Sequence, residues 1–413
     1  MDSMITVDDI RQASERVASV IRPTPVDRSA NLSRLAGRPI VLKPEYRQRT
    51  GSFKIRGATN LISRLPPGTE VIAASAGNHA QGVALAAATS GLRATIFMPR
   101  NAALPKVQAT RDYGAAVQLV SDTVDDAIVA ARAYAEERHA TFVPPFDDPL
   151  IIAGQGTIGL ELASEVPEAE VVVVPVGGGG LISGIATALA SARPRPRVVG
   201  VQAAGAACMQ ASLRAGRCVS LPTVVTMADG IAIKGPSPLT LAHVDAYVDE
   251  IVTVEEDDIS RAVLLLLERA KAVVEPAGAS SLAALLAGKV AGDGPAVAVL
   301  SGGNVDPLLL MKLIDHGLSA AGRFLILRIL LDDRPGSLAA LTAAVAAKGL
   351  NVLAVEHHRS GLALHMDQVE VVLTLETRDP EHRDAVVDDL RGTGYRVELV
   401  GERSASPVHP IEG

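Results

Sequence analysis

Apolar and polar positions alternate with strand-like and helix-like periods along most of the chain. Residues 6–21 have the spacing of an amphipathic helix, with Thr6 as its predicted N-cap and with Pro23 and Pro25 beyond its end. The apolar run IVLKPE, from Ile40, predicts a strand that leads into the stretch RTGSFKIRGATN. The chain is therefore expected to open with a helix and then a strand.

Two longer series of strands and helices follow. In the first, the runs VIAAS, ATIFMP and AAVQLV alternate with the Ala-rich run HAQGVALAAATSG and with helices around 106–111 and 125–138. The second contains a helix at 159–165, VVVVPV, LISGIATALASA, VVGVQ, a helix at 259–272 and AVAVLSG. This alternation is typical of parallel sheets covered by helices on both faces. We therefore predict an α/β fold of two doubly wound units, the smaller and mobile one at about 44–141, with a ligand at the carboxyl ends of the strands.

The pattern changes from Arg323 onward. RFLILRILL, LNVLAVEHH, VEVVLTLET and YRVELV predict strands, whereas LAALTAAVAAKG and residues 380–391 predict helices. The resulting βαββαβ order is ferredoxin-like. We therefore expect a catalytic domain at 1–322, a separate module at 323–401 and a disordered tail at 402–413, where two prolines and little apolar content occur.

Composition narrows the function classes. Hydrophobic residues make up 48% of the 413 residues but aromatic residues only 2%, so the core must consist of Ala, Val, Leu and Ile, and its elements must approach closely. The net charge of −7 and the lack of a basic cluster with aromatics argue against nucleic-acid binding. No signal peptide or membrane-spanning run is evident, and two cysteines, Cys208 and Cys218, indicate a reducing compartment. We expect a cytoplasmic protein.

Lys54, within RTGSFKIRGATN, is the first candidate for chemistry. A lysine that forms a Schiff base must lose its proton near neutral pH, which requires a partly desolvated site or a neighbouring positive charge such as Arg56. Taken alone, the stretch favours an ordinary surface lysine in a basic turn. Its interpretation depends on the motifs SAGNHAQG, PVGGGGLISG and LSGGNVD, which follow in that order.

A strand runs into Gly177–Gly180 and then into a helix. Four glycines allow the backbone to wrap an anion, with N–H groups and the helix dipole directed at it, so a phosphate is the expected ligand. A GxGxxG dinucleotide motif does not fit, because its last position falls on Ile182 or Ser183 and the next strand ends in Gln202 rather than an acid. A Walker A loop does not fit either, because no lysine follows the glycines. A tight turn without a ligand is the alternative.

SAGNHAQG places Ser75, Asn78 and His79 where a strand passes into a helix. Short polar side chains and free N–H groups at a helix start suit a carboxylate, here that of an amino-acid substrate. The alternative is a helix cap with an incidental histidine. The motif therefore adds a candidate substrate site to the candidate phosphate site.

Together the four motifs resemble the pyridoxal-phosphate enzymes of the tryptophan synthase beta fold, called fold type II. Within that group the resemblance is to the threonine ammonia-lyases, or threonine dehydratases, over residues 5–320, and the remainder resembles an ACT regulatory domain. The resemblance implies pyridoxal 5'-phosphate as cofactor and deamination of L-threonine to 2-oxobutanoate and ammonia by β-elimination of water. It also implies deamination of L-serine to pyruvate, and a place as the first step of isoleucine synthesis.

The resemblance also implies roles for individual residues. Lys54, Ser75, Asn78 and His79 match catalytic positions, and Ser301 matches the partner of the pyridine nitrogen. A hydroxyl cannot hold that nitrogen protonated, which makes the ring a weaker electron sink and suits β-elimination better than transamination. Glu275 matches a position near the cofactor, although it also fits an acid at a helix start. The cofactor-binding positions implied are Phe53, Lys54, Asn78, Gly177, Gly178, Gly179, Gly180, Leu181, Glu275 and Ser301.

Several alternatives remain. A serine racemase shares these motifs, but Ala76 stands where that family has its second acid/base serine, and Gln202 and Cys208 stand where it has acidic metal ligands. A 3-hydroxyaspartate dehydratase and a non-catalytic amino-acid sensor are further alternatives. The spacing of His357, His358 and His365 matches no metal-binding helix pattern, so we expect no metal site.

The C-terminal module suggests regulation. Asp333, Arg334, Gly336 and Ser337 lie where ACT domains often bind an amino acid, and free N–H groups at a helix start suit its carboxylate. A branched-chain amino acid is the expected effector. The alternative is a module that only holds subunits together, and in either case a homo-oligomer, a dimer or a tetramer, is expected.

Overall fold

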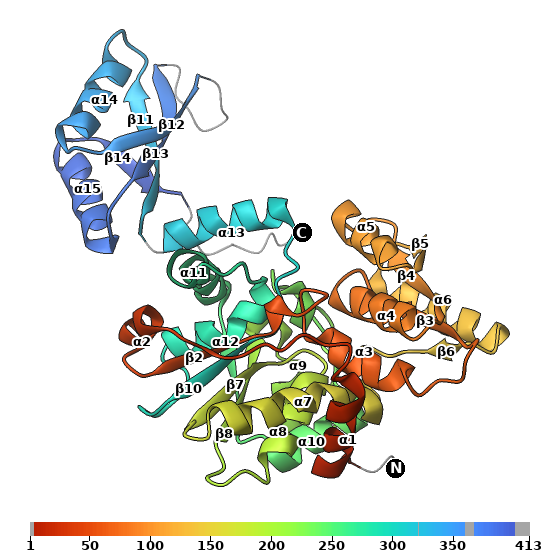
Figure 1. The fold of residues 1–413 in the computed structure, drawn as a ribbon. Helices are drawn as coiled ribbons and strands as arrows, with labels where there is room; N and C mark the ends of the chain where they lie inside the picture. The colour runs from red at the N-terminus through yellow and green to blue at the C-terminus, as the bar shows by residue number, and fades with distance from the viewer. Residues whose placement is uncertain (1–3, 321, 360–366, 401–413) are drawn as a thin grey trace. The chain divides into compact units, whose positions relative to one another are not determined.

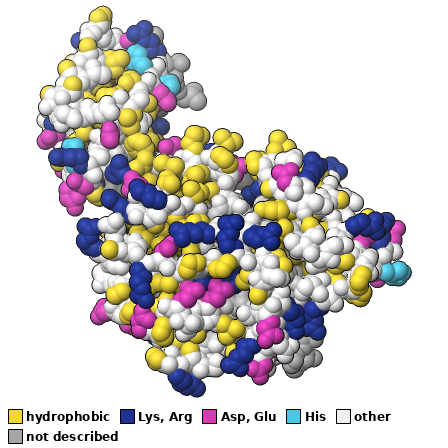
Figure 2. Space-filling model, viewed as in Figure 1, with side chains coloured by type: hydrophobic (Ala, Val, Ile, Leu, Met, Phe, Trp, Pro, Cys, Tyr) yellow, Lys and Arg dark blue, Asp and Glu magenta, His cyan; other side chains and the backbone are white. Residues whose placement is uncertain are grey.

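The computed structural model describes residues 4–320, 322–359 and 367–400. They form two compact units, which divide between Met311 and Lys312 (Figure 1). On the face of the first unit in Figure 2, Lys and Arg side chains lie among Asp and Glu side chains, so this face carries both signs of charge. Within the described ranges no helix is both long and apolar enough to cross a bilayer.

The larger sheet of the first unit has the strand order β1-β2-β10-β7-β8-β9. Only the pair β1–β2 is antiparallel, and every residue of β2, β7 and β10 is buried. Strands buried on both faces need a helical layer on each side. The strands are β1 Asp27–Arg28, β2 Ile40–Pro44, β7 Val171–Pro175, β8 Arg197–Ala203, β9 Glu250–Val254 and β10 Ala296–Leu300.

Helices supply these two layers (Figure 1). Val172 and Val174 of β7 pack in one cluster with Ile158 of α7 and Ile182 of α8, and α12 contacts β7 and β10. The helices around this sheet are α1 Val7–Val17, α2 Ala30–Ala36, α7 Pro149–Glu165, α8 Gly180–Leu189, α9 Cys208–Ala215, α10 Pro238–Tyr247, α11 Glu256–Leu265 and α12 Pro276–Leu286.

The smaller sheet is all parallel, with the order β5-β4-β3-β6. Val71 and Ala73 of β3 pack in a cluster with α3 and α4, whereas Ile72 and Ala74 pack with α6. Successive side chains of a strand point to opposite faces, so helices cover both. The elements are α3 Lys54–Ile62, β3 Glu70–Ala74, α4 Asn78–Thr89, β4 Arg93–Pro99, α5 Leu104–Asp112, β5 Ala116–Ser121, α6 Val124–Glu137 and β6 Thr141–Phe142.

The predicted α/β fold of two doubly wound units is confirmed, but three predicted helices have other bounds. The first ends at Val17, because the N–H groups of Val20 and Ile21 both donate to the Val17 carbonyl and turn the chain. The helix predicted at 159–165 already starts at Pro149, with Asp148 as its N-cap. The helix predicted at 259–272 ends at Leu265 and continues as a short π-helix, Leu266–Ala270.

The second unit has the predicted βαββαβ order and one antiparallel sheet, β12-β13-β11-β14. Alternate residues of β11 pack against α14 and α15. The ferredoxin-like prediction is thus confirmed, while the domain boundary at 322/323 stays a prediction and residues 402–413 lie outside the described ranges. The elements are α13 Pro307–Ala320, which spans the division between the units, β11 Phe324–Asp332, α14 Ser337–Ala347, β12 Asn351–His358, β13 Gln368–Glu376, α15 Pro380–Gly392 and β14 Arg396–Leu399.

Candidate active site

A cavity of about 710 Å³ lies at the carboxyl ends of the strands of both sheets in the first unit. Its volume falls within the range usual for small-molecule sites, roughly 300–1,000 Å³. All the catalytic and cofactor-binding positions predicted from the sequence line it: Phe53, Lys54, Ser75, Asn78, His79, Gly177, Gly178, Gly179, Gly180, Leu181, Glu275 and Ser301. Folding therefore brings four separate sequence motifs to one place.

Lys54 is the first residue of α3, and its side chain faces the cavity. The side chain is partly buried, and its ammonium donates a hydrogen bond to the Pro145 carbonyl at 2.7 Å and lies 5.1 Å from the centre of the Phe53 ring. Burial lowers the pKa of Lys54 to about 8, although the Glu275 carboxylate opposes this. At pH 7 roughly one such amine in ten is neutral, against fewer than about one in a thousand for an ordinary lysine.

Arg56 does not assist this shift, contrary to one of the two routes considered from the sequence. Residues two positions apart on a helix do not face each other, and Arg56 points away from the cavity. Its guanidinium pairs with Glu45 at 2.8 Å and with Glu161 at 2.6 Å, and these carboxylates outweigh the effect of burial and raise the pKa of Arg56. Desolvation, the other route, lowers the pKa of Lys54.

We expect the amine of Lys54 to react with aldehydes at unusually low pH. In the protein without cofactor, the rate of pyridoxal phosphate addition should rise with pH and level off above about 8, because only the neutral amine adds to the aldehyde. Stopped-flow absorbance between pH 6 and 10 measures this midpoint. Glu275→Gln should move the midpoint lower, since the Glu275 charge raises the pKa of Lys54. A midpoint near 10 in the wild type would mean that the amine is solvated.

The four glycines form a cradle at the start of α8. A Cβ atom on Gly178 would lie 2.4 Å from the Phe146 ring, and one on Gly179 would lie 2.7 Å from Met209, so neither position has room for a side chain. Gly179 also has φ +95°, which favours glycine. It caps α8 without a side chain, which leaves the first N–H groups of the helix for another acceptor. This cradle fits the phosphate of pyridoxal 5'-phosphate.

Asn78 and Glu275 meet across the cavity. The Asn78 amide donates to the Glu275 carboxyl group at 2.7 Å. Burial and the nearby Asp229 charge raise the pKa of Glu275 to about 7, although the bond from Asn78 and the charges of Lys106 and Lys54 oppose this. Glu275 is the N-cap of α12, but its side chain does not cap that helix. Glu275 is therefore an acid at a helix start whose side chain also faces the cavity, and its place near the cofactor stays a prediction.

His79 is buried in the first turn of α4 and is uncharged. Its Nε2 lies 2.9 Å from the Val143 carbonyl and therefore carries the proton of the neutral ring. Burial and the positive charge of Lys54 lower the pKa of His79 to about 3, which outweighs the hydrogen bond to Val143. At neutral pH His79 can hold a hydrogen bond but does not carry a positive charge.

Ser75, Ala76 and Ser301 complete the polar end of the site. Ser75 Oγ accepts a hydrogen bond from the Gly77 N–H at 3.1 Å, and Ala76 also lines the cavity. Ser301 directly follows β10, is 4% exposed and, among the described residues, its hydroxyl has no hydrogen-bond partner. A hydroxyl that faces a cavity without a partner is available to a ligand.

The two positions that a racemase would use for a metal lie together in a different role. The amide nitrogen of Gln202 is 3.7 Å from Cys208 Sγ and also donates to the Ala206 carbonyl, so the amide is occupied within the protein. Of the three histidines considered, His357 and His358 lie on exposed β12, and His365 is outside the described residues. In the described ranges no three His, Cys, Asp or Glu side chains gather as a metal site requires.

Several residues of the cavity have no signal in the sequence. Pro145 and Phe146 contact Lys54 and the glycines, and they come from the loop between β6 and α7. Two ion pairs also line the cavity, Lys106 with Asp229 at 2.8 Å and Lys234 with Asp125 at 2.6 Å. Each pair joins the part of the first unit around the smaller sheet to the part around the larger sheet. The two residues of each pair lie more than a hundred positions apart in the sequence.

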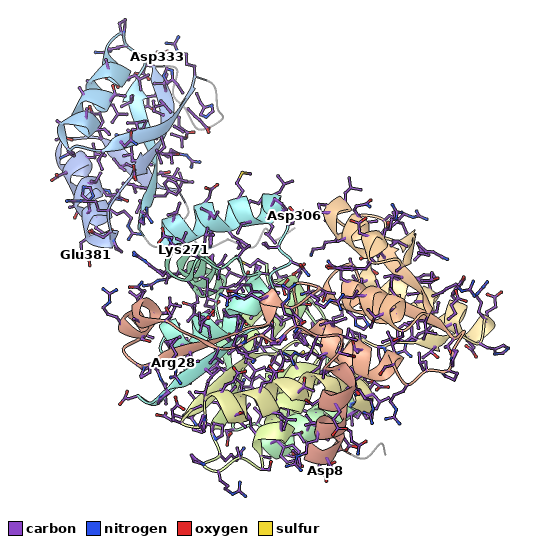
Figure 3. All side chains as sticks on the ribbon, in the orientation of Figure 1. Asp8, Arg28, Lys271, Asp306, Asp333 and Glu381 are labelled. Atoms are coloured by element: carbon purple, nitrogen blue, oxygen red, sulfur yellow. The ribbon has the colours of Figure 1, made fainter. Side chains whose placement is uncertain are left out.

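The predicted effector residues lie in the second unit, between β11 and α14. Asp333, labelled in Figure 3, pairs with Arg359 at 3.4 Å, and the Arg334 N–H donates to the Asp332 carbonyl. Gly336 caps α14 with φ +95°, and Ser337 is the first residue of the helix. The predicted turn at a helix start is therefore present.

Comparisons with known proteins agree with this geometry. The family model described as pyridoxal-phosphate dependent enzyme matches residues 17–302, and the ACT domain model matches residues 325–394. The L-threonine ammonia-lyase of Geobacter sulfurreducens is 47% identical over 395 residues, which cover 95% of this chain and 98% of the relative.

Solved structures show the same likeness. A crystal structure of a threonine deaminase from the organism abbreviated T.th. is 40% identical, with a TM-score of 0.70 over 73% of this chain and 99% of that one. Maize serine racemase is 34% identical, with a TM-score of 0.72 over 77% of this chain and 99% of that one. The likeness in fold thus includes a lyase and a racemase. The family match over most of the chain, together with the lysine, the glycine cradle and the hydroxyl around one cavity, shows that the chain belongs to the pyridoxal-phosphate dependent enzymes, in the group that includes the L-threonine ammonia-lyases.

Proposed function

We propose that this protein deaminates L-threonine to 2-oxobutanoate and ammonia, and L-serine to pyruvate, by β-elimination of water. The observation that carries the proposal is the partly buried Lys54 amine, with its pKa of about 8, in one cavity with the cradle Gly177–Gly180 and Ser301. Similarity to a named L-threonine ammonia-lyase over 95% of the chain supports the same reaction. We also propose a role in isoleucine synthesis, which rests on the resemblance alone.

Pyridoxal 5'-phosphate, when bound, supplies an aldehyde that condenses with amino groups and a ring that withdraws electrons from the substrate Cα. In this proposal the cradle N–H groups would hold its phosphate, and Ser301 and Asn78 would hold its ring. Leu181 and Phe53 line the apolar sides of the cavity. The neutral amine of Lys54 would remove the proton from the substrate Cα.

The substrate carboxylate is proposed to lie at the start of α4. Gly77 caps this helix without a side chain, so the first N–H groups of α4 lack an intrahelical acceptor, and Ser75 adds a hydroxyl beside them. His79 contributes as a neutral residue, because a pKa of about 3 excludes it as a proton carrier at neutral pH. The carboxylate would thereby be fixed while Lys54 acts on the neighbouring carbon.

The charges around the cavity favour a neutral substrate side chain. Apart from Lys54, the ammonium groups among the described lining residues are Lys106 and Lys234, and each is paired with an aspartate. A second carboxylate, as in 3-hydroxyaspartate, would therefore enter without a free cation. The second carboxylate would thus gain no partner in the cavity, which favours threonine and serine over 3-hydroxyaspartate.

Threonine is therefore expected to exceed 3-hydroxyaspartate in kcat/KM by at least about 100-fold. An assay of 2-oxo acid formation over a panel of hydroxy amino acids measures this ratio. Asp229→Asn should shrink the ratio, because it frees the Lys106 ammonium for a second carboxylate. Asp8→Asn serves as control, because Asp8 belongs to an exposed ion pair with Arg11 and does not line the cavity. Equal use of both substrates in the wild type would contradict the proposed specificity.

We propose that the second unit binds a branched-chain amino acid through Asp333, Arg334, Gly336 and Ser337. The ligand carboxylate would meet the N–H groups at the start of α14. Couplings between sites are typically about 1–3 kcal/mol, so isoleucine or valine should shift half-saturation by threonine roughly 5- to 150-fold. Steady-state kinetics with and without the amino acid measure this shift.

Ser337→Asp tests the effector site more cleanly than a change at Gly336, where any side chain would strain the backbone at φ +95°. The new carboxylate would repel that of the ligand and abolish the response, while Ser337→Asn, the uncharged control, should retain it. A chain truncated before Arg323 that still responds would place the effector site in the first unit.

We also propose a cytoplasmic homo-oligomer, and the unpaired Cys208 and Cys218 agree with a reducing compartment.

A further inference from the structure

Asn304, in the motif LSGGNVD, has no role in the proposal above. It is not one of the described residues that line the cavity. It belongs to the loop between β10 and α13, two residues before Asp306, which Figure 3 labels at the start of α13. Its side chain is nevertheless linked to the active-site residue Asn78, which is 226 positions away in the sequence.

The hydrogen bonds of Asn304 fix the direction of its amide. Asn304 Nδ2 donates to the backbone carbonyl of Thr50 at 2.7 Å and to Asn78 Oδ1 at 2.8 Å, and a third acceptor, Gln81 Oε1, lies 3.4 Å away. A backbone carbonyl can only accept, so the group of Asn304 that faces Thr50 must be the NH₂. The atom of Asn78 that faces this NH₂ must then be its oxygen.

This order extends to the cavity. With its oxygen bound to Asn304, Asn78 has to present its NH₂ to the other side, where Nδ2 lies 2.7 Å from Glu275 Oε1. A reversed Asn78 amide would oppose its oxygen to the Glu275 carboxyl and its NH₂ to the NH₂ of Asn304. Asn304 therefore determines which end of the Asn78 amide faces the cavity.

The backbone around Asn304 is built to hold it. A Cβ atom on Gly51 would lie 2.3 Å from Asn304 Oδ1, and Gly51 has φ +70°, so only glycine leaves space for the amide. The Gly303 N–H donates to the Gly51 carbonyl, and the Phe53 N–H donates to the Ser301 carbonyl. The loop that carries Asn304 is thereby joined to the loop that precedes Lys54.

We propose that Asn304 is a positioning residue, which holds the NH₂ group of Asn78 toward Glu275 and the bound cofactor. The inference rests on the proposed role of Asn78 at the cofactor ring. Loss of Asn304 would leave the Asn78 amide free to reverse and to present an oxygen where a donor is needed. The cofactor should then be held less firmly, although Asn304 does not touch it.

The test is a double-mutant cycle on the full-length holoenzyme, with pyridoxal phosphate as the ligand. The readout is the rate at which the cofactor leaves, followed by its absorbance in the presence of a trapping protein. Asn78→Ala and Asn304→Ala should each raise this rate about tenfold, as expected for one lost or misdirected hydrogen bond to a buried partner. The double variant should match Asn78→Ala alone, because Asn304 acts only through Asn78.

Two further variants keep the result interpretable. Asn304→Asp has nearly the same volume but opposes a carboxylate to the Thr50 carbonyl, so it should raise the rate as Asn304→Ala does, even if the alanine variant folds poorly. Val305→Ala changes the same loop without touching the amide chain and should leave the rate unchanged.

Other results would overturn the inference. An additive loss of about a hundredfold in the double variant would mean that Asn304 acts independently of Asn78. An unchanged rate in both Asn304 variants, or in Asn78→Ala, would mean that the amide chain does not hold the cofactor. Failure of the proposed function is distinguishable, since the wild type would then carry no cofactor absorbance and form no 2-oxo acid.

Discussion

Lys54→Ala is expected to abolish 2-oxo acid production, with kcat at least about 10⁴-fold below that of the wild type. The variant loses both the amine that removes the Cα proton and the group that joins the cofactor to the chain. The fold should persist, because the ammonium makes one hydrogen bond, to the Pro145 carbonyl, and no ion pair among the described residues. Steady-state assays together with thermal melting measure both effects.

Two further substitutions define what is lost. Lys54→Arg keeps a positive charge, but a guanidinium stays protonated at neutral pH, so this variant should be equally inactive. Lys289→Ala, at an exposed position outside the cavity, serves as the matched control and should retain full activity. Turnover above about 1% of the wild-type rate in purified Lys54→Ala would place the essential amine on another residue.

Arg56→Met is expected to give the largest loss of stability, about 3–5 kcal/mol in the free energy of unfolding. Arg56 and Glu45 are both fully buried, and the guanidinium donates two hydrogen bonds of 2.8 Å to the Glu45 carboxylate. Without Arg56 that carboxylate would remain buried beside Thr24 with no positive partner. The melting temperature should fall by roughly 6–20 °C.

The double variant Arg56→Met with Glu45→Gln should recover much of this loss, because it removes the orphaned charge and keeps an acceptor for Thr24. Arg28→Met is the matched control for an exposed pair: its partner Glu168 is 48% exposed, so the expected change is under about 1 kcal/mol. Similar losses from Arg56→Met and Arg28→Met would show that burial does not set the strength of these pairs.

The order of elements follows from local patterns in the sequence. Short apolar runs such as VVVVP and AVAVL favour strands covered on both faces, and the change to βαββαβ after Arg323 is visible as a change of period. The glycine cradle could also be predicted, because consecutive glycines between a strand and a helix have few other uses. These features depend on neighbours in sequence.

The bounds of α7 show where local patterns fail. Its sequence PLIIAGQGTIG contains three glycines, which lower the expected helix propensity. In the structure each glycine marks a close helix contact: a Cβ on Gly154 would strike Gly57, one on Gly156 the Gly184 carbonyl, and one on Gly159 Ala188. Tertiary packing therefore stabilises a helix that propensity disfavours. The composition of the core predicted close approach between elements in general, but not which helices would meet at these glycines.

The chemistry of the site was decided by partners distant in sequence. The sequence alone showed Lys54 with Arg56 as a possible positive neighbour, whereas the fold turns Arg56 toward Glu45 and Glu161 and places the partly buried Lys54 beside Pro145. The pKa of Lys54 is consequently lowered by burial, which no local motif encodes.

The sequence by itself determined which residue types are present for the reaction: a lysine, a phosphate cradle and a hydroxyl, each attached to a predictable strand or helix end. Only the tertiary structure decided their protonation and direction. Desolvation depends on all atoms around a charge, and the orientation of an amide depends on which donors and acceptors meet it, as Thr50, Asn304 and Glu275 do around Asn78. Both are properties of contacts that form only when distant segments pack together.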